Sequence, residues 1–157
     1  MAAMPARKRT DDDLADLIAR ECIATKLRRL NRAVTAIYDE ALRPHGLKVS
    51  QMGVLVTVAK LGEASPGTVG RTLDLETSTL SRNVDRMRAR GWLETVPTGD
   101  ARAHLLRVTP RGRRLLRDAH DAWCRAQERA GTLLGEQGIR GISLTAARFA
   151  KARGARS

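Results

Sequence analysis

The fold is decided by residues 65–108, which read SPGTVGRTLDLETSTLSRNVDRMRARGWLETVPTGDARAHLLRV. Ser65 followed by Pro66 predicts the start of a short helix, because the hydroxyl can cap the helix and proline's fixed φ suits its first position. The tripeptide at residues 74–76 then supplies a tight turn. Two helices joined by such a turn form a helix-turn-helix, in which the second helix can enter the major groove of DNA.

The second helix is expected to start at Thr77 or Ser78 and to end at Gly91. Its buried stripe is predicted by the helical spacing of Leu80, Val84 and Met87. Its other face carries short hydrogen-bonding groups and cations: Ser78, Thr79, Ser81, Arg82, Asn83, Arg86 and Arg90. Arginine can pair bidentately with guanine and asparagine with adenine, so this face suits a major groove. Taken alone, the same face would equally suit an ordinary solvated helix surface.

After this helix the hydrophobic period changes from helical to alternating. Residues 92–96 and 104–108 are predicted as two strands of a hairpin, joined by turn residues. The loop holds Arg102, which can enter a narrow minor groove, and Asp100, which can hold that arginine in position. An ordinary surface turn is the alternative. A hairpin directly after a helix-turn-helix predicts a winged helix-turn-helix, so the expected fold class is mainly α with a small β-hairpin wing.

Long helical patterns flank this lobe on both sides. One helix is expected over residues 11–42, and a shorter one from Ser50 to Gly62. Another long helix should open at Thr109 and Pro110, with a last short helix over residues 143–152. The predicted organisation is a basic arm (1–10), a dimerisation helix (11–43), the winged lobe (47–109), C-terminal dimerisation helices (110–153) and a basic tail (154–157). Helices this long leave apolar surface that a second subunit is expected to cover.

The amino-acid composition limits the classes of partner that the chain is expected to bind. The chain of 157 residues has 29 Lys plus Arg against 17 Asp plus Glu, a formal charge of +12. That balance favours a polyanion, either nucleic acid or an anionic membrane surface. No apolar run approaches the ~20 residues of a membrane span, so a soluble, cytoplasmic protein is expected. No nucleophile elbow, phosphate loop or paired-carboxylate pattern is visible, which argues against an enzyme. No cofactor or metal is expected.

Several motifs together resemble the MarR type of multiple-antibiotic-resistance regulators. They are LSRNV at residues 80–84, RGWLE at 90–94, DAR at 100–102 and VTPRG at 108–112. The resemblance runs from about residue 24 to residue 130. It implies a triangular dimer with interlocked terminal helices, whose two winged lobes read a pseudo-palindromic operator. It also implies DNA contacts from Ser78, Thr79, Ser81, Arg82 and Arg86, a wing-tip role for Arg102, and phosphate contacts from Thr68 and Arg71. Gly70 stands where the family commonly has alanine, and Pro97 and Thr98 depart from its pattern before the wing loop.

The resemblance further implies an effector pocket, and a repressor released by a small molecule. Its candidate lining is Tyr38, Leu42, Met52, Leu55 and Trp123, although their spacing alone favours core positions. Cys22 and Cys124 offer an alternative redox switch, and Arg20 and Lys26 can lower the pKa of the first thiol. His120 and Cys124 lie four residues apart and could join Cys22 of a partner helix in binding a metal, which is the weaker signal.

Two functions of other classes stay open at this stage. A non-specific nucleoid-type protein would fit the charge and the basic tail, and it would bind scrambled DNA nearly as well as any operator. A protein-interaction module could reuse the winged fold without binding DNA. A preference for one DNA sequence would distinguish a regulator from a nucleoid-type protein. Substitution of Arg82 and Arg102 would leave the function of a protein-interaction module intact but not that of a regulator.

Overall fold

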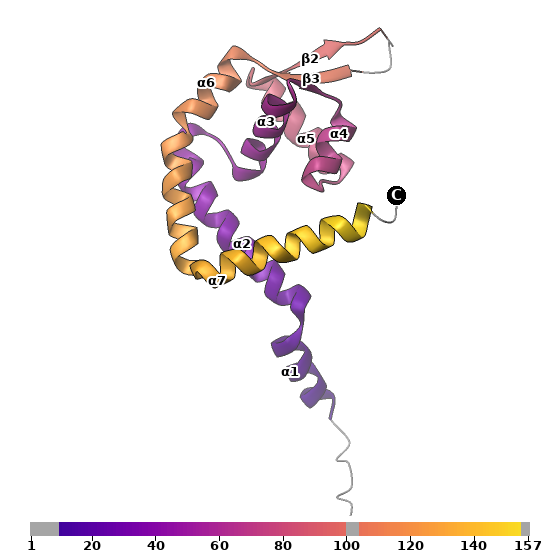
Figure 1. Ribbon diagram of the computed structural model, residues 1–157, viewed down its shortest axis with the longest axis vertical. Helices are drawn as coiled ribbons and strands as arrows, with labels where there is room; N and C mark the ends of the chain where they lie inside the picture. Colours follow the sequence, from indigo (N-terminus) through magenta and orange to yellow (C-terminus); the bar gives the residue numbers. More distant parts are fainter. Residues whose placement is uncertain (1–9, 100–103, 155–157) are drawn as a thin grey trace, which may run out of the picture. The chain divides into compact units, whose positions relative to one another are not determined.

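The computed structural model describes residues 10–99 and 104–154, with side chains to residue 152. It is mainly helical with a small antiparallel sheet (Figure 1), so the predicted fold class is confirmed. No helix in the described ranges is long and apolar enough to cross a membrane. The elements in order are α1 (Asp11–Glu21), α2 (Ile23–Leu42), the 3-10 turn η1 (Arg43–His45), α3 (Val49–Leu61), β1 (Glu63–Ala64), α4 (Pro66–Leu73), α5 (Thr77–Ala89), β2 (Leu93–Pro97), β3 (His104–Val108), α6 (Pro110–Asp118) and α7 (His120–Gly154).

The chain divides into two compact units, residues 1–36 and 37–157. In the first unit α1 starts with a capping box, in which the Thr10 hydroxyl accepts from the Asp13 N–H and the Asp13 carboxylate accepts from the Thr10 N–H. The single helix expected over residues 11–42 is wrong. Cys22 has an extended conformation (φ −61°, ψ 109°) that ends α1, and its carbonyl then accepts from the Lys26 N–H to start α2.

The core of the second unit lies among α3, α4, α5, the sheet and the start of α6 and α7. α3 packs against α4, β1, β3 and α6 and is buried on most of its surface. The sheet has the order β1-β3-β2, with β3 paired antiparallel to both neighbours. The second hairpin strand has its predicted bounds, and the first, β2, begins and ends one residue later than the alternation predicted. The two-residue strand β1 was not predicted, because so short a segment shows no alternation of apolar and polar residues.

The start of α3 differs from the expectation. Ser50 was expected to cap it, but the helix begins at Val49, after Lys48. The Lys48 N–H donates to the Gln51 side-chain oxygen (3.1 Å), and the Val49 N–H donates to an Asp39 carboxylate oxygen (2.8 Å). A carboxylate ten residues away in the sequence thus satisfies a free N–H that a local hydroxyl was expected to satisfy.

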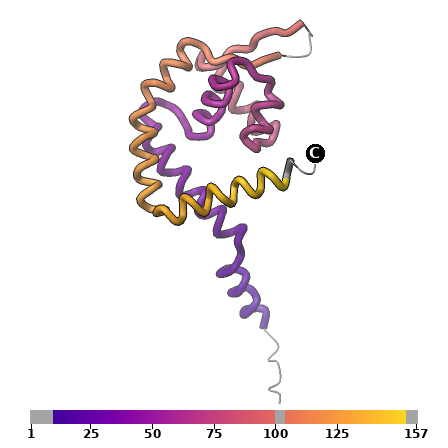
Figure 2. Tube along the Cα trace, viewed as in Figure 1, coloured from indigo at the N-terminus to yellow at the C-terminus, as the bar shows by residue number. Residues whose placement is uncertain are grey.

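The C-terminal helices also differ from the expectation. Ala119, Ala122, Ala126 and Ala130 form the buried stripe along the junction of α6 and α7. Within α7, Gly135 has a left-handed φ of 65° with ψ 167°, and the chain changes direction sharply in this orange-to-yellow part (Figure 2). Helix resumes after Gly135, so the short last helix expected from Ser143 is wrong. Among common residues, glycine alone adopts this conformation without strain.

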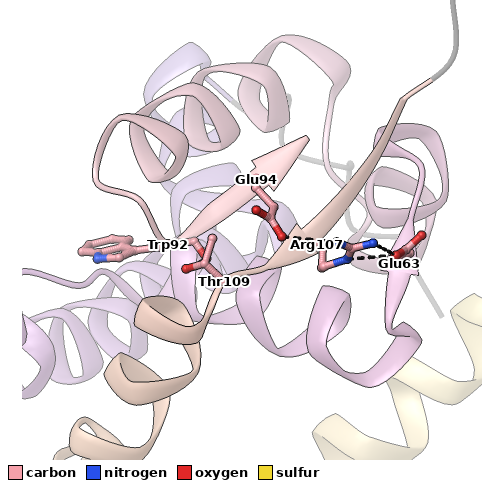
Figure 3. A network of polar contacts seen from close by, with 5 residues as sticks. All are labelled: Glu63, Trp92, Glu94, Arg107 and Thr109. Carbon is pink, nitrogen blue, oxygen red and sulfur yellow. Dashed lines mark hydrogen bonds and ion pairs between the residues drawn. The ribbon is translucent and has the colours of Figure 1, made fainter. Parts of the chain in front are cut away.

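A compact joint connects the sheet to α6 (Figure 3). The Thr109 hydroxyl donates to the Gly91 carbonyl (2.7 Å) and accepts from the Gly112 N–H (3.0 Å), which makes it the predicted cap of α6. The Thr109 N–H donates to the Trp92 carbonyl (3.1 Å). Gly112 lies so close that a Cβ there would overlap the Trp92 carbonyl oxygen and come within 2.8 Å of Val108 Cγ1.

Gly112→Ala is therefore expected to destabilise the fold. Because the added methyl meets backbone that cannot turn away, the free energy of unfolding should fall by roughly 1 to 3 kcal/mol, measured by urea titration. Gly141→Ala is the matched control, since a Cβ at this position of α7 meets nothing within 4 Å. There the higher helix propensity of alanine should leave stability equal or raised by up to about 1 kcal/mol. Equal effects of the two changes would contradict the close packing of the joint.

Candidate nucleic-acid interface

The turn between α4 and α5 brings these two helices into close contact. Asp74 ends α4 with a left-handed φ of 53°, and the Leu75 N–H donates to the Gly70 carbonyl (2.9 Å). A Cβ on Gly70 would lie 3.3 Å from the Leu75 carbonyl oxygen and 3.5 Å from Leu80 Cδ2. Gly70 thus permits a helix approach that a side chain would resist.

Three buried side chains fix α5 to the lobe, and the rest of its surface faces outward. Leu80, Val84 and Met87 are all buried, as the helical spacing predicted. The helix begins at Thr77 after Glu76, whose carbonyl accepts from the Thr79 and Leu80 N–H groups, so the expected hydroxyl cap is wrong. The predicted DNA-contacting residues Ser78, Thr79, Ser81, Arg82 and Arg86 are exposed, and Asn83 is half-buried. Within the described ranges no ion pair engages Arg82 or Arg86.

The two predicted phosphate-contacting residues of α4 are linked to each other. Ser65 Oγ accepts from the Thr68 N–H (3.2 Å) and lies 3.0 Å from Thr68 Oγ1, as expected for the cap of this helix. Arg71 Nη2 donates to Thr68 Oγ1 (3.2 Å). The Thr68 hydroxyl is therefore engaged within the helix start, and its effect on a partner would pass largely through the orientation of the exposed Arg71.

Arg90 was expected on the outward face of α5, and it is exposed, but its side chain contacts other parts of the lobe. Its Nη1 donates to the Gly46 carbonyl, and its guanidinium carbon lies 4.9 Å from the centre of the Trp92 ring. Such stacking of a cation on an aromatic face is favourable. Arg90 thus joins the end of α5 to the turn before α3, and sequence reasoning missed this role because the contact spans 44 residues.

An ion-pair bridge crosses the sheet beside the helix-turn-helix. Arg107 on β3 contacts Glu63 on β1 and Glu94 on β2 (Figure 3). The hydrogen bond to Glu63 is the main cause that raises the pKa of Arg107. This bridge was not predicted from the sequence. The predicted wing residues Asp100 and Arg102 lie outside the described residues.

Comparison with known proteins agrees with this arrangement of a helix-turn-helix and a hairpin. A model of the MarR family matches residues 45–103, which include α3, β1, α4, α5 and β2. The chain is 28% identical to the M. tuberculosis transcriptional regulator MOSR, solved in complex with DNA, over 84% of this chain and 98% of that chain, with a TM-score of 0.73. Residues 45–103 of the chain are thus similar to the MarR family.

Two further proteins that resemble this chain are more distant in sequence. The multiple antibiotic resistance protein MarR of Salmonella typhimurium is 26% identical over 92 residues, which are 58% of this chain. The match spans 64% of that protein's own length. A MarR variant from E. coli, solved with operator DNA, is 18% identical with a TM-score of 0.75, covering 85% of this chain and 96% of that one. At this identity the likeness shows the fold.

The residues expected to line an effector pocket lie mostly in the core of the lobe. Leu42, Met52 and Leu55 are buried core residues, and Tyr38 packs against them. Trp123 on α7 is 36% exposed. A cavity of about 750 Å³ lies elsewhere, between α4, α5 and the wing strands. Its lining includes Arg71, Leu75, Ser81, Arg88, Thr95 and His104 and none of the five expected residues.

The two cysteines have different surroundings. Cys22 lies at the break between α1 and α2, where hydrogen bonds from the hydroxyl and then the N–H of Thr25 lower the pKa of its thiol. Cys124 on α7 lies 3.7 Å from His120 Nε2, and His120 Nδ1 lies 3.3 Å from an Asp121 carboxylate oxygen. Within the described residues no three potential ligands gather as a metal site would require.

Thr25→Val should raise the pKa of the Cys22 thiol toward its ordinary value. The sign follows because the Thr25 hydroxyl favours the thiolate, so its loss makes deprotonation harder and moves thiolate formation to higher pH. The measurement is thiolate absorbance against pH in a Cys124→Ser background, which leaves one thiol. Thr35→Val on α2 is the control and should leave the titration unchanged. A titration that Thr25→Val does not move would contradict the hydrogen bond.

Proposed function

We propose that this chain is a sequence-specific DNA-binding transcription regulator that acts as a homodimer. The observation that carries the proposal is α5, which is held from behind by Leu80, Val84 and Met87 and presents a polar, cationic face beside a hairpin. This is the arrangement in which a recognition helix enters a major groove. The match of residues 45–103 to the MarR family model and the DNA complex of the 28% identical MOSR support it further.

The roles of individual residues follow from their exposure. Arg82 lies near the start of α5 with an exposed side chain, and Asn83 follows it, so this part of the helix would reach base edges. Arg71 on α4 would contact phosphate, since it lies outside the recognition helix and is oriented by Thr68. Arginine on phosphate positions a protein on DNA without reading its sequence. Asp100 and Arg102 would act at the adjacent minor groove.

The dimer is proposed from apolar surface on both terminal segments. Side chains that a monomer would leave in water are Leu14, Ile18, Ile23 and Leu27 on α1 and α2, and Leu133, Ile139, Ile142, Leu144 and Phe149 on α7. Exposed large apolar side chains in such number on each segment favour an interface. In a two-fold dimer the two copies of α5 would reach half-sites about one helical turn apart, roughly 34 Å.

We further infer that the protein represses transcription and is released by a small effector. The cavity beside α5 lies where a bound molecule would change the position of the recognition helix relative to the wing strands. A redox switch at Cys22 and Cys124 is the alternative. The lowered pKa of Cys22 favours its thiolate, the form that reacts with oxidants.

Arg82→Ala and Arg71→Ala are expected to weaken DNA binding in different ways. Losing a base contact should cost about 1 to 3 kcal/mol on the operator and relax specificity at one position, whereas losing a phosphate contact should weaken all duplexes alike and reduce the salt slope by about one ion. The measurement is titration of the operator and of a scrambled duplex, after the operator has been selected from a random library.

The control for this titration is Arg125→Ala, which removes an exposed arginine from α7, outside the winged lobe. Its effect should be small and equal on both duplexes. Identical losses from the Arg82 and Arg71 variants on every sequence would contradict their separate roles. Repeating the titration with phenolic compounds, peroxides and metal salts tests effector release, and unchanged operator affinity throughout would contradict it.

Charge on the terminal segments should dissociate the dimer. Ile18→Glu or Phe149→Glu places a carboxylate where about 1.5 to 3 kcal/mol of burial per apolar side chain is expected, so the dissociation constant should rise at least about tenfold. Val56→Glu is the control, because Val56 is similarly exposed (49%) but lies on α3, outside both segments. Sedimentation velocity measures the oligomeric state of each variant. A wild-type monomer, or variants that stay dimeric, would contradict the proposed interface.

A further inference from the structure

We propose that Arg107 is a positioning residue, which holds the wing strands at a set angle to the helix-turn-helix by bridging Glu63 and Glu94. The inference rests on the proposed DNA-binding function and assigns a role within it to three residues that do not belong to the recognition face. Two of these residues are acidic. Their removal therefore distinguishes a positioning role from a simple attraction between positive charges and DNA.

The bridge runs straight across the sheet. Glu63 and Glu94 are the register partners of Arg107 on β1 and β2, so all three side chains lie in one row. Arg107 Nε donates to Glu63 Oε1 (2.9 Å), its Nη2 contacts the same oxygen, and its Nη1 lies 3.5 Å from Glu94 Oε1. Figure 3 shows the guanidinium between the two carboxylates. The planar fork of arginine suits such a bridge, whereas the single ammonium of lysine does not.

The three strands that the bridge joins belong to different functional parts. β1 leads directly into Ser65, the cap of α4, and therefore belongs to the helix-turn-helix. β2 and β3 form the wing. Because β1 pairs with β3 over two residues alone, Glu63 and Ala64, the backbone ladder between these parts is short. A side-chain bridge at this point adds a polar connection to the apolar packing of Leu93, Leu106 and Val108 in the core.

The bridge is too exposed to matter greatly for folding. The side chains of Arg107, Glu63 and Glu94 are 43%, 37% and 47% exposed. Exposed ion pairs stabilise proteins by at most about 1 kcal/mol, so variants of the bridge should stay folded. On a lobe that binds a polyanion, carboxylates repel phosphate, and removing one should tighten binding by charge alone. A positioning role predicts instead that removing a carboxylate weakens DNA binding.

The experiment compares operator affinities of Glu63→Gln, Glu94→Gln and Arg107→Lys with the wild type. A positioning role predicts that all three weaken binding, by about two- to fivefold, although the first two remove a negative charge and the third keeps its positive one. Glu76→Gln is the matched control. It removes the same charge beside α5, where the Glu76 side chain makes no capping bond, and it should tighten binding.

A second readout locates the effect on the DNA. Hydroxyl-radical footprinting should show reduced protection of the outer base pairs of each half-site, where the wing is expected to lie, with the centre of each half-site still protected. Circular dichroism melts verify that each variant is folded. Tighter or unchanged binding by Glu63→Gln and Glu94→Gln would overturn the inference. A wild-type protein that prefers no duplex would instead contradict the proposed function itself.

Discussion

The functional surface depends on the packing of α5 against α4 behind it. Leu80, Val84 and Met87 take one side of α5 out of water, and Gly70 lets α4 approach closely enough for Leu80 to lie in contact. Burial of such side chains is worth roughly 1.5 to 3 kcal/mol each, far more than the polar groups opposite could supply. The helix can therefore devote its outward face to a partner, because its place in the lobe is set from the inside.

The rest of the lobe transmits that position to the wing through rigid contacts. Arg90 fastens the end of α5 to the turn before α3, and the next residues form the joint in which Thr109 bonds the carbonyls at 91 and 92. The same joint starts α6, which continues into α7. A displacement of α6 would thus reach the wing root through the hydrogen bonds of Thr109, which tolerate little extension. If the terminal helices form the proposed dimer interface, this linkage would give it a mechanical path to the proposed DNA-binding surface.

Local signals predicted the lobe well. Ser65 with Pro66 and Thr109 with Pro110 begin helices as expected, because cap and proline act within one turn. The buried side of α5 and the existence of the two hairpin strands could be predicted from hydrophobic periodicity alone. Failures occurred where distant residues decide the outcome. Asp39 caps α3 from ten residues away, and β1 exists because β3 lies beside it. Nothing local in the sequence marks either contact.

The candidate site shows the same division between local and distant effects. Exposure of Arg82 and Arg86 could be predicted, since it follows from helical phase and three apolar neighbours. The internal contacts of Arg90 could not be predicted, although helical phase gives it the same expected exposure and it has the same side chain. What differs is the environment: a free carbonyl at Gly46 and an aromatic face at Trp92 offer Arg90 both a hydrogen bond and a stacking surface. A positive charge on the outward face of such a helix is thus available to a partner only where the fold offers it no internal acceptor.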